Sequence, residues 1–272
     1  MALTSFQRTI CRLIAENRIA SGESYIAGGV ALNEVTGAGR VSRDIDLFHD
    51  TDAALEATWQ ADRQLLERHG FGVRVLRARR GLVEAEVHLD DESVLMEWAR
   101  DSSFRFFPLV THEDFGLTLH PVDLATNKVL ALTGRLEARD WIDVLTSHER
   151  IQPLGYLAWA ACGKDPGFSP ASILEHAART SRYSATEIGQ LAFEGVPPDA
   201  AALSRAWHRM LAGARAIVAA LPPEDAGTCV IARSGALCRA AATDLPSLVA
   251  DGAVTFHPGS IRGALPRMAP PQ

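Results

Sequence analysis

Hydrophobic positions change their spacing about halfway along the chain. In the first half, short apolar runs typical of strands lie between segments whose apolar residues recur every three to four positions, as in amphipathic helices. From Pro121 onward, segments rich in Ala and Leu with helical spacing dominate. The pattern therefore predicts an α+β protein with a β-containing N-terminal half, a helical C-terminal half and a boundary near residues 119–121.

Individual elements follow from this periodicity and from the turn residues between them. Gly81 and the polar residues 90–92 separate three successive strands, which predicts an antiparallel meander. A break at Pro222 and Pro223 ends the last long helix, and we expect residues 263–272 to be frayed. We expect helices at residues 4–20, 30–35, 52–69, 122–133, 139–149, 152–162, 170–180, 185–192, 199–220 and 245–251, and strands at 24–27, 45–48, 71–78, 82–89, 93–99 and 229–232.

The charge balance narrows the classes of function. The 272 residues include 27 Lys and Arg against 33 Asp and Glu, a formal net charge of -6 at pH 7. Proteins that coat nucleic acid through a diffuse positive field usually carry a clear basic excess, so this class is disfavoured. A local basic groove is compatible with this negative net charge.

The cysteines and the apolar segments favour a cytoplasmic protein. Cys11, Cys162, Cys229 and Cys238 form no C-x-x-C pair, and such scattered thiols fit a reducing compartment. Charged residues interrupt the apolar residues of the N-terminus, unlike in a signal peptide. The longest uncharged stretch, residues 151–163, is shorter than the roughly 18–20 residues of a membrane span. The nine histidines show no spacing typical of zinc sites, so we expect no zinc.

The candidate chemistry lies in residues 25–50. An expected strand ends at Gly28 and Gly29, a short helix follows, and the next strand carries Asp44 and Asp46. Side chains two positions apart on a strand point to the same face about 7 Å apart, so both carboxylates can serve one site that holds a pair of divalent cations. Glycine amides at a helix start can approach phosphate oxygens closely. The alternative is an ordinary capping turn followed by an edge strand.

This segment resembles the nucleotidyltransferase superfamily of the DNA polymerase β type. Its signature is a hydrophobic residue, Gly-Gly or Gly-Ser, a spacer, and then two Asp residues flanking a hydrophobic one. Here Ala27 precedes Gly28-Gly29, and Asp44-Ile45-Asp46 supplies the second half. The family has a third carboxylate on a later neighbouring strand, for which Glu97 is the best match and Glu86 the second choice.

A closer resemblance is to the AbiEii/AbiGii-type nucleotidyltransferase toxins of bacterial toxin–antitoxin systems. They share a strand of the form R-x-S-x-DIDL, here residues 40–47, which includes Ser42. They also share a helical lysine followed about a dozen residues later by Arg-Asp-x-x-Asp. The matching residues are Lys128, Arg139, Asp140 and Asp143, and the resemblance covers roughly residues 24–150.

The second motif also has a physical interpretation of its own. On a helix, Asp140, Asp143 and Ser147 share one face, which we expect to be open to a site, while the opposite face is apolar. The long stem of Lys128 can be covered while its ammonium group reaches a phosphate. The alternatives are a solvated lysine and an ordinary ion pair between Arg139 and Asp140 or Asp143.

The resemblance implies a nucleotidyltransferase-type mixed sheet with flanking helices, and a division into three parts. Residues 1–120 would form the catalytic domain, residues 121–222 a helical domain that completes the site, and residues 223–272 a small, partly irregular extension. The implied reaction transfers a nucleoside monophosphate from an NTP to an acceptor hydroxyl, with release of pyrophosphate.

The implied roles divide into metal binding and nucleotide binding. Asp44, Asp46 and Glu97 would hold two Mg²⁺ ions, and Glu97 would also accept the proton. Lys128 would bind the triphosphate and stabilise the leaving pyrophosphate. The nucleotide would further contact Gly28, Gly29, Ser42, Arg139, Asp140 and Asp143.

The toxin resemblance favours RNA, above all tRNA, as the acceptor, and a cognate antitoxin as a protein partner. Arginines around one expected strand would then line a path for an RNA backbone, although a solvated strand edge explains them equally well. They are Arg68, Arg74, Arg77, Arg79 and Arg80. The alternative functions are a small-molecule nucleotidyltransferase of the antibiotic-modifying type and a module that binds a partner without turnover.

Overall fold

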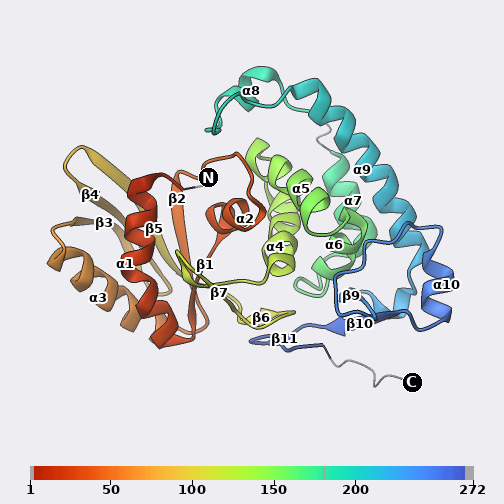
Figure 1. The fold of residues 1–272 in the computed structure, drawn as a ribbon, viewed down its shortest axis with the longest axis horizontal. Coiled ribbons are helices and arrows are strands. Elements are labelled where there is room, and N and C mark those ends of the chain that lie inside the picture. The colour runs from red at the N-terminus through yellow and green to blue at the C-terminus, as the bar shows by residue number, and fades with distance from the viewer. Residues whose placement is uncertain (1–2, 180–181, 267–272) are drawn as a thin grey trace. The chain divides into compact units, whose positions relative to one another are not determined.

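The computed structural model describes residues 3–179 and 182–266, which form two compact units (Figure 1). The first unit comprises the described residues up to Ser103 together with 108–120 and 192–195. The second comprises 104–107, 121–191 and the described residues from Val196 onward. Each unit therefore takes in a short segment from the other half of the sequence.

The first unit contains a seven-stranded mixed sheet in the order β3-β4-β5-β2-β1-β8-β7. The pairs β2–β5 and β1–β8 are parallel and the others antiparallel, so β3, β4 and β5 form the expected meander. The sheet confirms the predicted α+β class. Its strands are β1 (Ser24–Ala27), β2 (Asp44–His49), β3 (Gly72–Arg79), β4 (Leu82–Leu89), β5 (Glu92–Arg100), β7 (Val110–His112) and β8 (Gly116–Thr118).

Three helices accompany this sheet: α1 (Ser5–Ser21), α2 (Gly28–Thr36) and α3 (Asp52–Arg68). The helix α1 begins with a capping box, in which the Thr4 side chain accepts from the Gln7 amide and the Gln7 side chain accepts from the Thr4 amide. It packs against α3, and both helices contact β5. Buried and half-buried residues alternate along β2, so one face of this strand belongs to the core and the other is accessible.

The second unit is mainly helical, as predicted. Its helices are α4 (Pro121–Gly134), α5 (Ala138–Arg150), α6 (Leu154–Ala161), α7 (Pro170–Ala178), α8 (Ala185–Gly189), α9 (Ala200–Ala220) and α10 (Leu245–Ala250), with a 3₁₀ turn η1 (Pro223–Asp225). The strands β9 (Thr228–Ala232) and β10 (Val254–Pro258) pair antiparallel, as do β6 (Phe104–Arg105) and β11 (Ser260–Ile261). One core joins Tyr156 of α6, Ile217 of α9 and Val230 of β9.

The expected helices and strands are confirmed with ends within three residues, whereas β6, β7, β8, β10 and β11 were not predicted. Four of these five strands have only two or three residues, too few for an alternating pattern. Residue 180 of the expected helix 170–180 and residues 267–272 of the expected frayed end lie outside the described residues. The division at residues 120 and 222 stays a prediction. Within the described ranges, no helix has the length and apolar character needed to cross a membrane.

Candidate active site

Two neighbouring parallel strands bring three carboxylates onto one face of the sheet. Asp44 and Asp46 lie on the half-buried face of β2, while Ile45 and Leu47 between and beside them are fully buried. Asp46 is the register partner of Glu97 on β5. Paired residues of adjacent strands share a face, so Glu97 stands beside Asp46. Glu86, the second choice for the third carboxylate, lies one strand further away and forms a 2.7 Å ion pair with Arg74.

Negative charge is concentrated around Glu97. Its register partner on β4 is Glu84, so a row of acidic residues runs from β4 through β5 to β2. Burial raises the pKa of Glu97, and the charges of Glu84 and Asp44 raise it further, while Arg77 and Arg79 act in the opposite direction. A cation placed on this face would relieve the repulsion between the carboxylates.

The start of α2 lies directly against Asp46. Gly28 has φ +69°, in the left-handed region, and a Cβ atom at this position would lie 2.0 Å from the Asp46 Oδ2 atom. Both the backbone conformation and the missing side chain therefore require glycine here. The residue before the helix, Ala27, offers no capping side chain, so the first amides of α2, including that of Gly29, are suited to an anion.

The loop between α2 and β2 is fixed by a segment from far along the chain, which sequence reasoning missed. The Val41 amide donates to the Ala192 carbonyl at 3.0 Å, and the Glu194 amide donates to the Gly39 carbonyl at 2.7 Å. We call residues 192–195 the strap. No local pattern reveals it, because about 150 residues separate the two segments.

Ser42, at the end of this loop, is held on both sides. The Gln7 side chain donates to its carbonyl at 3.0 Å, and its hydroxyl donates to the Asp44 Oδ1 atom at 3.3 Å. Ser42 is buried, so this hydrogen bond orients the Asp44 carboxylate from inside the fold.

The carboxylates on this face are hard oxygen donors, the type of ligand that Mg²⁺ prefers. In residues 3–179 and 182–266, no three or more His, Cys, Asp or Glu side chains form a group that could hold a metal ion. Mg²⁺ is typically bound through one or two carboxylates together with substrate phosphates and water, rather than by a complete protein cage. Asp44 and Asp46 next to the start of α2 supply such a partial set.

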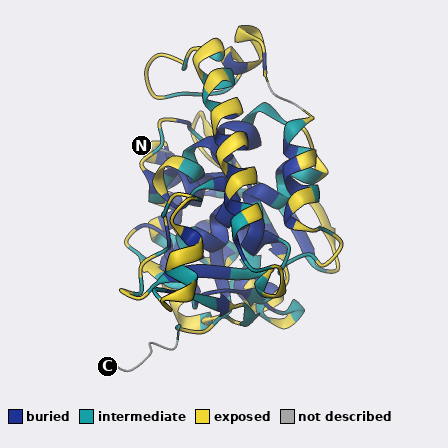
Figure 2. Cartoon of the chain, turned by 90° about the vertical axis from the view of Figure 1, so that its right-hand side faces the viewer, coloured by how far each residue is buried: buried dark blue, intermediate teal, exposed yellow. Residues whose placement is uncertain are grey.

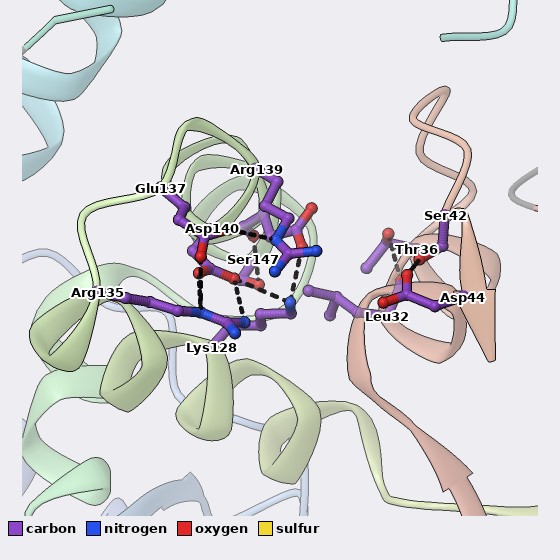
Figure 3. Close-up of polar contacts among 11 residues, drawn as sticks. Leu32, Thr36, Ser42, Asp44, Lys128, Arg135, Glu137, Arg139, Asp140 and Ser147 are labelled. Carbon is purple, nitrogen blue, oxygen red and sulfur yellow. Dashed lines mark hydrogen bonds and ion pairs between the residues drawn. The ribbon is translucent and has the colours of Figure 1, made fainter. Parts of the chain in front are cut away.

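The second motif forms a buried ion cluster within the second unit (Figure 3). The Lys128 Nζ atom, on α4, lies 3.0 Å from Asp140 Oδ1 and 3.2 Å from Asp143 Oδ2, both on α5. Arg135 forms a further 2.7 Å ion pair with Asp140. Burial alone would raise the pKa of Asp140, but the charges and hydrogen bonds of Lys128 and Arg135 lower it below its ordinary value.

This cluster corrects two sequence-based expectations about α5. The face with Asp140, Asp143 and Ser147 is not an open polar surface, since all three residues are fully buried and the Lys128 ammonium fills the space between the carboxylates. Arg139 pairs with Glu137 at 2.6 Å, so neither Asp140 nor Asp143 is its ion-pair partner. Lys128 itself is a buried, paired residue rather than a solvated one.

The structure thus gathers the predicted residues in two groups. Within the first unit lie Gly28, Gly29, Ser42, Asp44, Asp46 and Glu97, and within the second lie Lys128, Arg139, Asp140 and Asp143. The arginines of β3, expected along an RNA path, are largely paired with acidic residues. Arg74 pairs with Glu86 at 2.7 Å and Arg77 lies 3.7 Å from Glu84.

Comparison by sequence finds no matching protein-family model and no matching curated protein. Comparison by structure finds JHP933 from Helicobacter pylori, with 14% identity and a TM-score of 0.51 over 78% of this chain and 91% of that one. Another similar structure is MenT4, nucleotidyltransferase toxin Rv2826c from Mycobacterium tuberculosis H37Rv, with 18% identity and a TM-score of 0.49 over 76% of this chain and 80% of that one. The chain therefore shares the fold of JHP933, and a nucleotidyltransferase toxin is among its structural neighbours.

Proposed function

We propose that this protein is a Mg²⁺-dependent nucleotidyltransferase that moves a nucleoside monophosphate from an NTP to an acceptor hydroxyl and releases pyrophosphate. The observation that carries the proposal is the alignment of Asp44, Asp46 and Glu97 on adjacent strands, with Gly28 of α2 directly against Asp46. Carboxylates beside the start of a helix suit a divalent cation and the phosphates that it binds.

The roles of the chain's own residues follow from their surroundings. Asp44 and Asp46 would hold Mg²⁺, with Glu97 completing the set, and Ser42 keeps Asp44 in place. Mg²⁺ bound there would polarise the α-phosphate and lower the pKa of the attacking hydroxyl. The amides at the start of α2, with Gly29, would bind phosphate oxygens.

Proton transfer is assigned to Glu97. Glu97 is the third carboxylate on this face and lies beside Asp46, so it is the group placed to accept the hydroxyl proton. The acceptor oxygen bonds to the α-phosphorus, the bond from that phosphorus to the pyrophosphate oxygen breaks, and the hydroxyl proton passes to Glu97.

Lys128, Arg139, Asp140 and Asp143 remain the proposed nucleotide-binding residues of the helical half. Because Asp140 and Asp143 hold the Lys128 ammonium on two sides, we assign them the role of positioning this cation toward a triphosphate. The toxin resemblance supports an RNA acceptor, above all tRNA, and a cognate antitoxin as partner, and the scattered cysteines support a cytoplasmic location.

The test is an incorporation assay with matched variants. Purified protein is incubated with each α-labelled NTP, Mg²⁺ and total RNA, and label entering RNA is measured for the wild type, D44N, D46N and D91N. Asp91 is an exposed carboxylate in the turn between β4 and β5, so D91N makes the same charge change away from the site. We expect loss of at least about a thousandfold in rate for D44N and D46N, unchanged thermal unfolding, and a normal rate for D91N.

Other outcomes of this assay contradict parts of the proposal. Near-normal turnover by D46N would refute the assigned metal site. Label entering a small-molecule acceptor but not RNA would show that the acceptor is a small molecule and not RNA. NTP binding without pyrophosphate release for any acceptor would show that the protein is a binding module without turnover.

A further inference from the structure

The outward face of α9 carries an unusual charge distribution. One face of this helix is buried in the second unit and includes Trp207, Met210, Leu211, Ala214 and Ile217. The opposite face is exposed, and the helices in Figure 2 show the same alternation of buried and exposed residues along their length. Its polar residues are Arg205, His208, Arg209 and Arg215.

The three arginines are not neutralised by acidic neighbours. Among the described residues, Arg205, Arg209 and Arg215 have no ion pair or hydrogen bond, and α9 contains no Asp or Glu. Asp199, just before the helix, is engaged as its cap and accepts from the Ala202 amide at 2.7 Å. A chain with a net charge of -6 thus presents a locally cationic helix face.

The spacing of the arginines suits an extended polyanion. Arg205 and Arg209 lie about one helical turn apart, and Arg205 and Arg215 are separated by about 15 Å along the axis. On a helical wheel Arg209 lies about 40° to one side of Arg205 and Arg215 about 80° to the other, so the three span about 120° of the exposed face. Each planar guanidinium can donate two parallel hydrogen bonds to one phosphate group. The three arginines can therefore contact several phosphates of one strand at the same time.

The residues between the arginines favour a phosphate backbone over a protein partner. Besides His208, the exposed residues among the arginines are small, including Ala212, Gly213 and Ala216. Stable protein interfaces usually depend on large aromatic or aliphatic side chains that fill pockets, and this face has none. Nucleic-acid backbones need only cations within reach, and small residues let the strand approach the helix closely.

We propose that Arg205, Arg209 and Arg215 on α9 bind the phosphate backbone of the RNA acceptor without regard to its sequence. This inference rests on the proposed function in so far as the acceptor is RNA. It places the main RNA contact on α9 instead of on β3, where the ion pairs with Glu84 and Glu86 reduce the positive charge available to a phosphate.

Direct binding tests the surface independently of catalysis. Fluorescein-labelled bulk tRNA is titrated with full-length protein, without NTP or Mg²⁺, at several salt concentrations. The variant R205Q/R209Q/R215Q is compared with R74Q/R77Q/R79Q, which removes the same charge from β3. We expect about a tenfold loss of affinity for the α9 variant at moderate salt, a salt slope shallower by about 2, and less than about a threefold loss for the β3 variant.

Each alternative result is decisive. An α9 variant that binds tRNA within twofold of the wild type, a larger loss in the β3 variant, or no binding by the wild type at low salt would overturn the inference. Poly-glutamate that binds as tightly as tRNA, with the same dependence on the α9 arginines, would assign the face to an acidic protein instead. If tRNA binds through α9 while no NTP is consumed with any acceptor, the RNA-binding role of α9 is supported and the proposed catalytic function is refuted.

Discussion

At the residue scale, the closest constraint on the candidate site is the contact between Gly28 and Asp46. A side chain at position 28 would occupy the place of the Asp46 carboxylate, so the glycine and the acid are linked by geometry. The same glycine begins α2, whose first amides receive no hydrogen bond from a capping side chain. A single missing methyl group thus sets both the position of a proposed metal ligand and the opening of a phosphate site.

We therefore expect Gly28→Ala to reduce the transfer rate by about a hundredfold or more, because a shift of about 1 Å in a catalytic group has this effect. Gly22→Ala is the matched control, since Gly22 has a similar φ of +64° but nothing lies within 4 Å of its Cβ position. Both variants carry a backbone strain of about 1–2 kcal/mol, and Gly28→Ala adds the collision with Asp46, so its melting temperature should fall at least as far as that of Gly22→Ala. Equal transfer rates for the two variants would contradict the role of the contact.

At the element scale, α4 and α5 are joined by the buried cluster of Lys128, Asp140 and Asp143. Two carboxylates that lose their cation in the interior cannot be solvated, and breaking such a buried pair typically costs about 3–5 kcal/mol. Lys128 therefore stabilises the helical unit in addition to its proposed role with the nucleotide.

The pH dependence of stability follows from the lowered pKa of Asp140. A carboxyl group whose pKa is lower in the folded than in the unfolded chain contributes stability above its unfolded pKa of about 3.9, and this is lost as the pH falls through the folded pKa. We expect Asp140→Asn to lower the free energy of unfolding by a few kcal/mol at pH 7, and by less and less as the pH falls from about 3.9 through the lower folded pKa. Urea unfolding at pH 7 and over a series of acid pH values measures this, with exposed Asp91→Asn as the control. A stability difference that grows in acid would contradict the assignment.

At the scale of the whole molecule, Asp123 links parts of the second unit that are distant in sequence. It accepts from the Phe106 and Phe107 amides at 2.9 and 3.1 Å and forms a 2.8 Å ion pair with Lys164. His257 in turn contacts the Phe106 carbonyl at 2.9 Å. The segment 104–107 therefore belongs to this unit through buried hydrogen bonds and not through its place in the sequence.

Replacing Asp123 by Ala should lower the free energy of unfolding by about 3–5 kcal/mol, because the buried Lys164 ammonium and two backbone amides lose their partner. Denaturant unfolding of the full chain measures the loss, and Glu67→Ala, which removes an exposed ion pair with Arg63, should change stability by no more than about 0.5 kcal/mol. A loss below about 1 kcal/mol would show that Asp123 does not hold the segment in place.

The sequence by itself determined the features that depend on local periodicity and on residue chemistry. Alternation along β2 placed Asp44 and Asp46 on one accessible face, and the glycines marked the start of α2. Turn residues separated the strands of the meander, and helical spacing predicted the C-terminal helices. These features are fixed by contacts within a few residues, which a linear pattern records.

The tertiary structure decided what depends on register and on contacts between distant segments. It placed Glu97 rather than Glu86 beside Asp46, paired Arg74 and Arg77 of β3 with acids, and closed the polar face of α5 with Lys128. It also brought the strap to the loop before β2. The physical reason is that strand register and long-range pairing result from the packing of the whole chain, where a shift of one residue reverses every side chain, and no single segment contains that information.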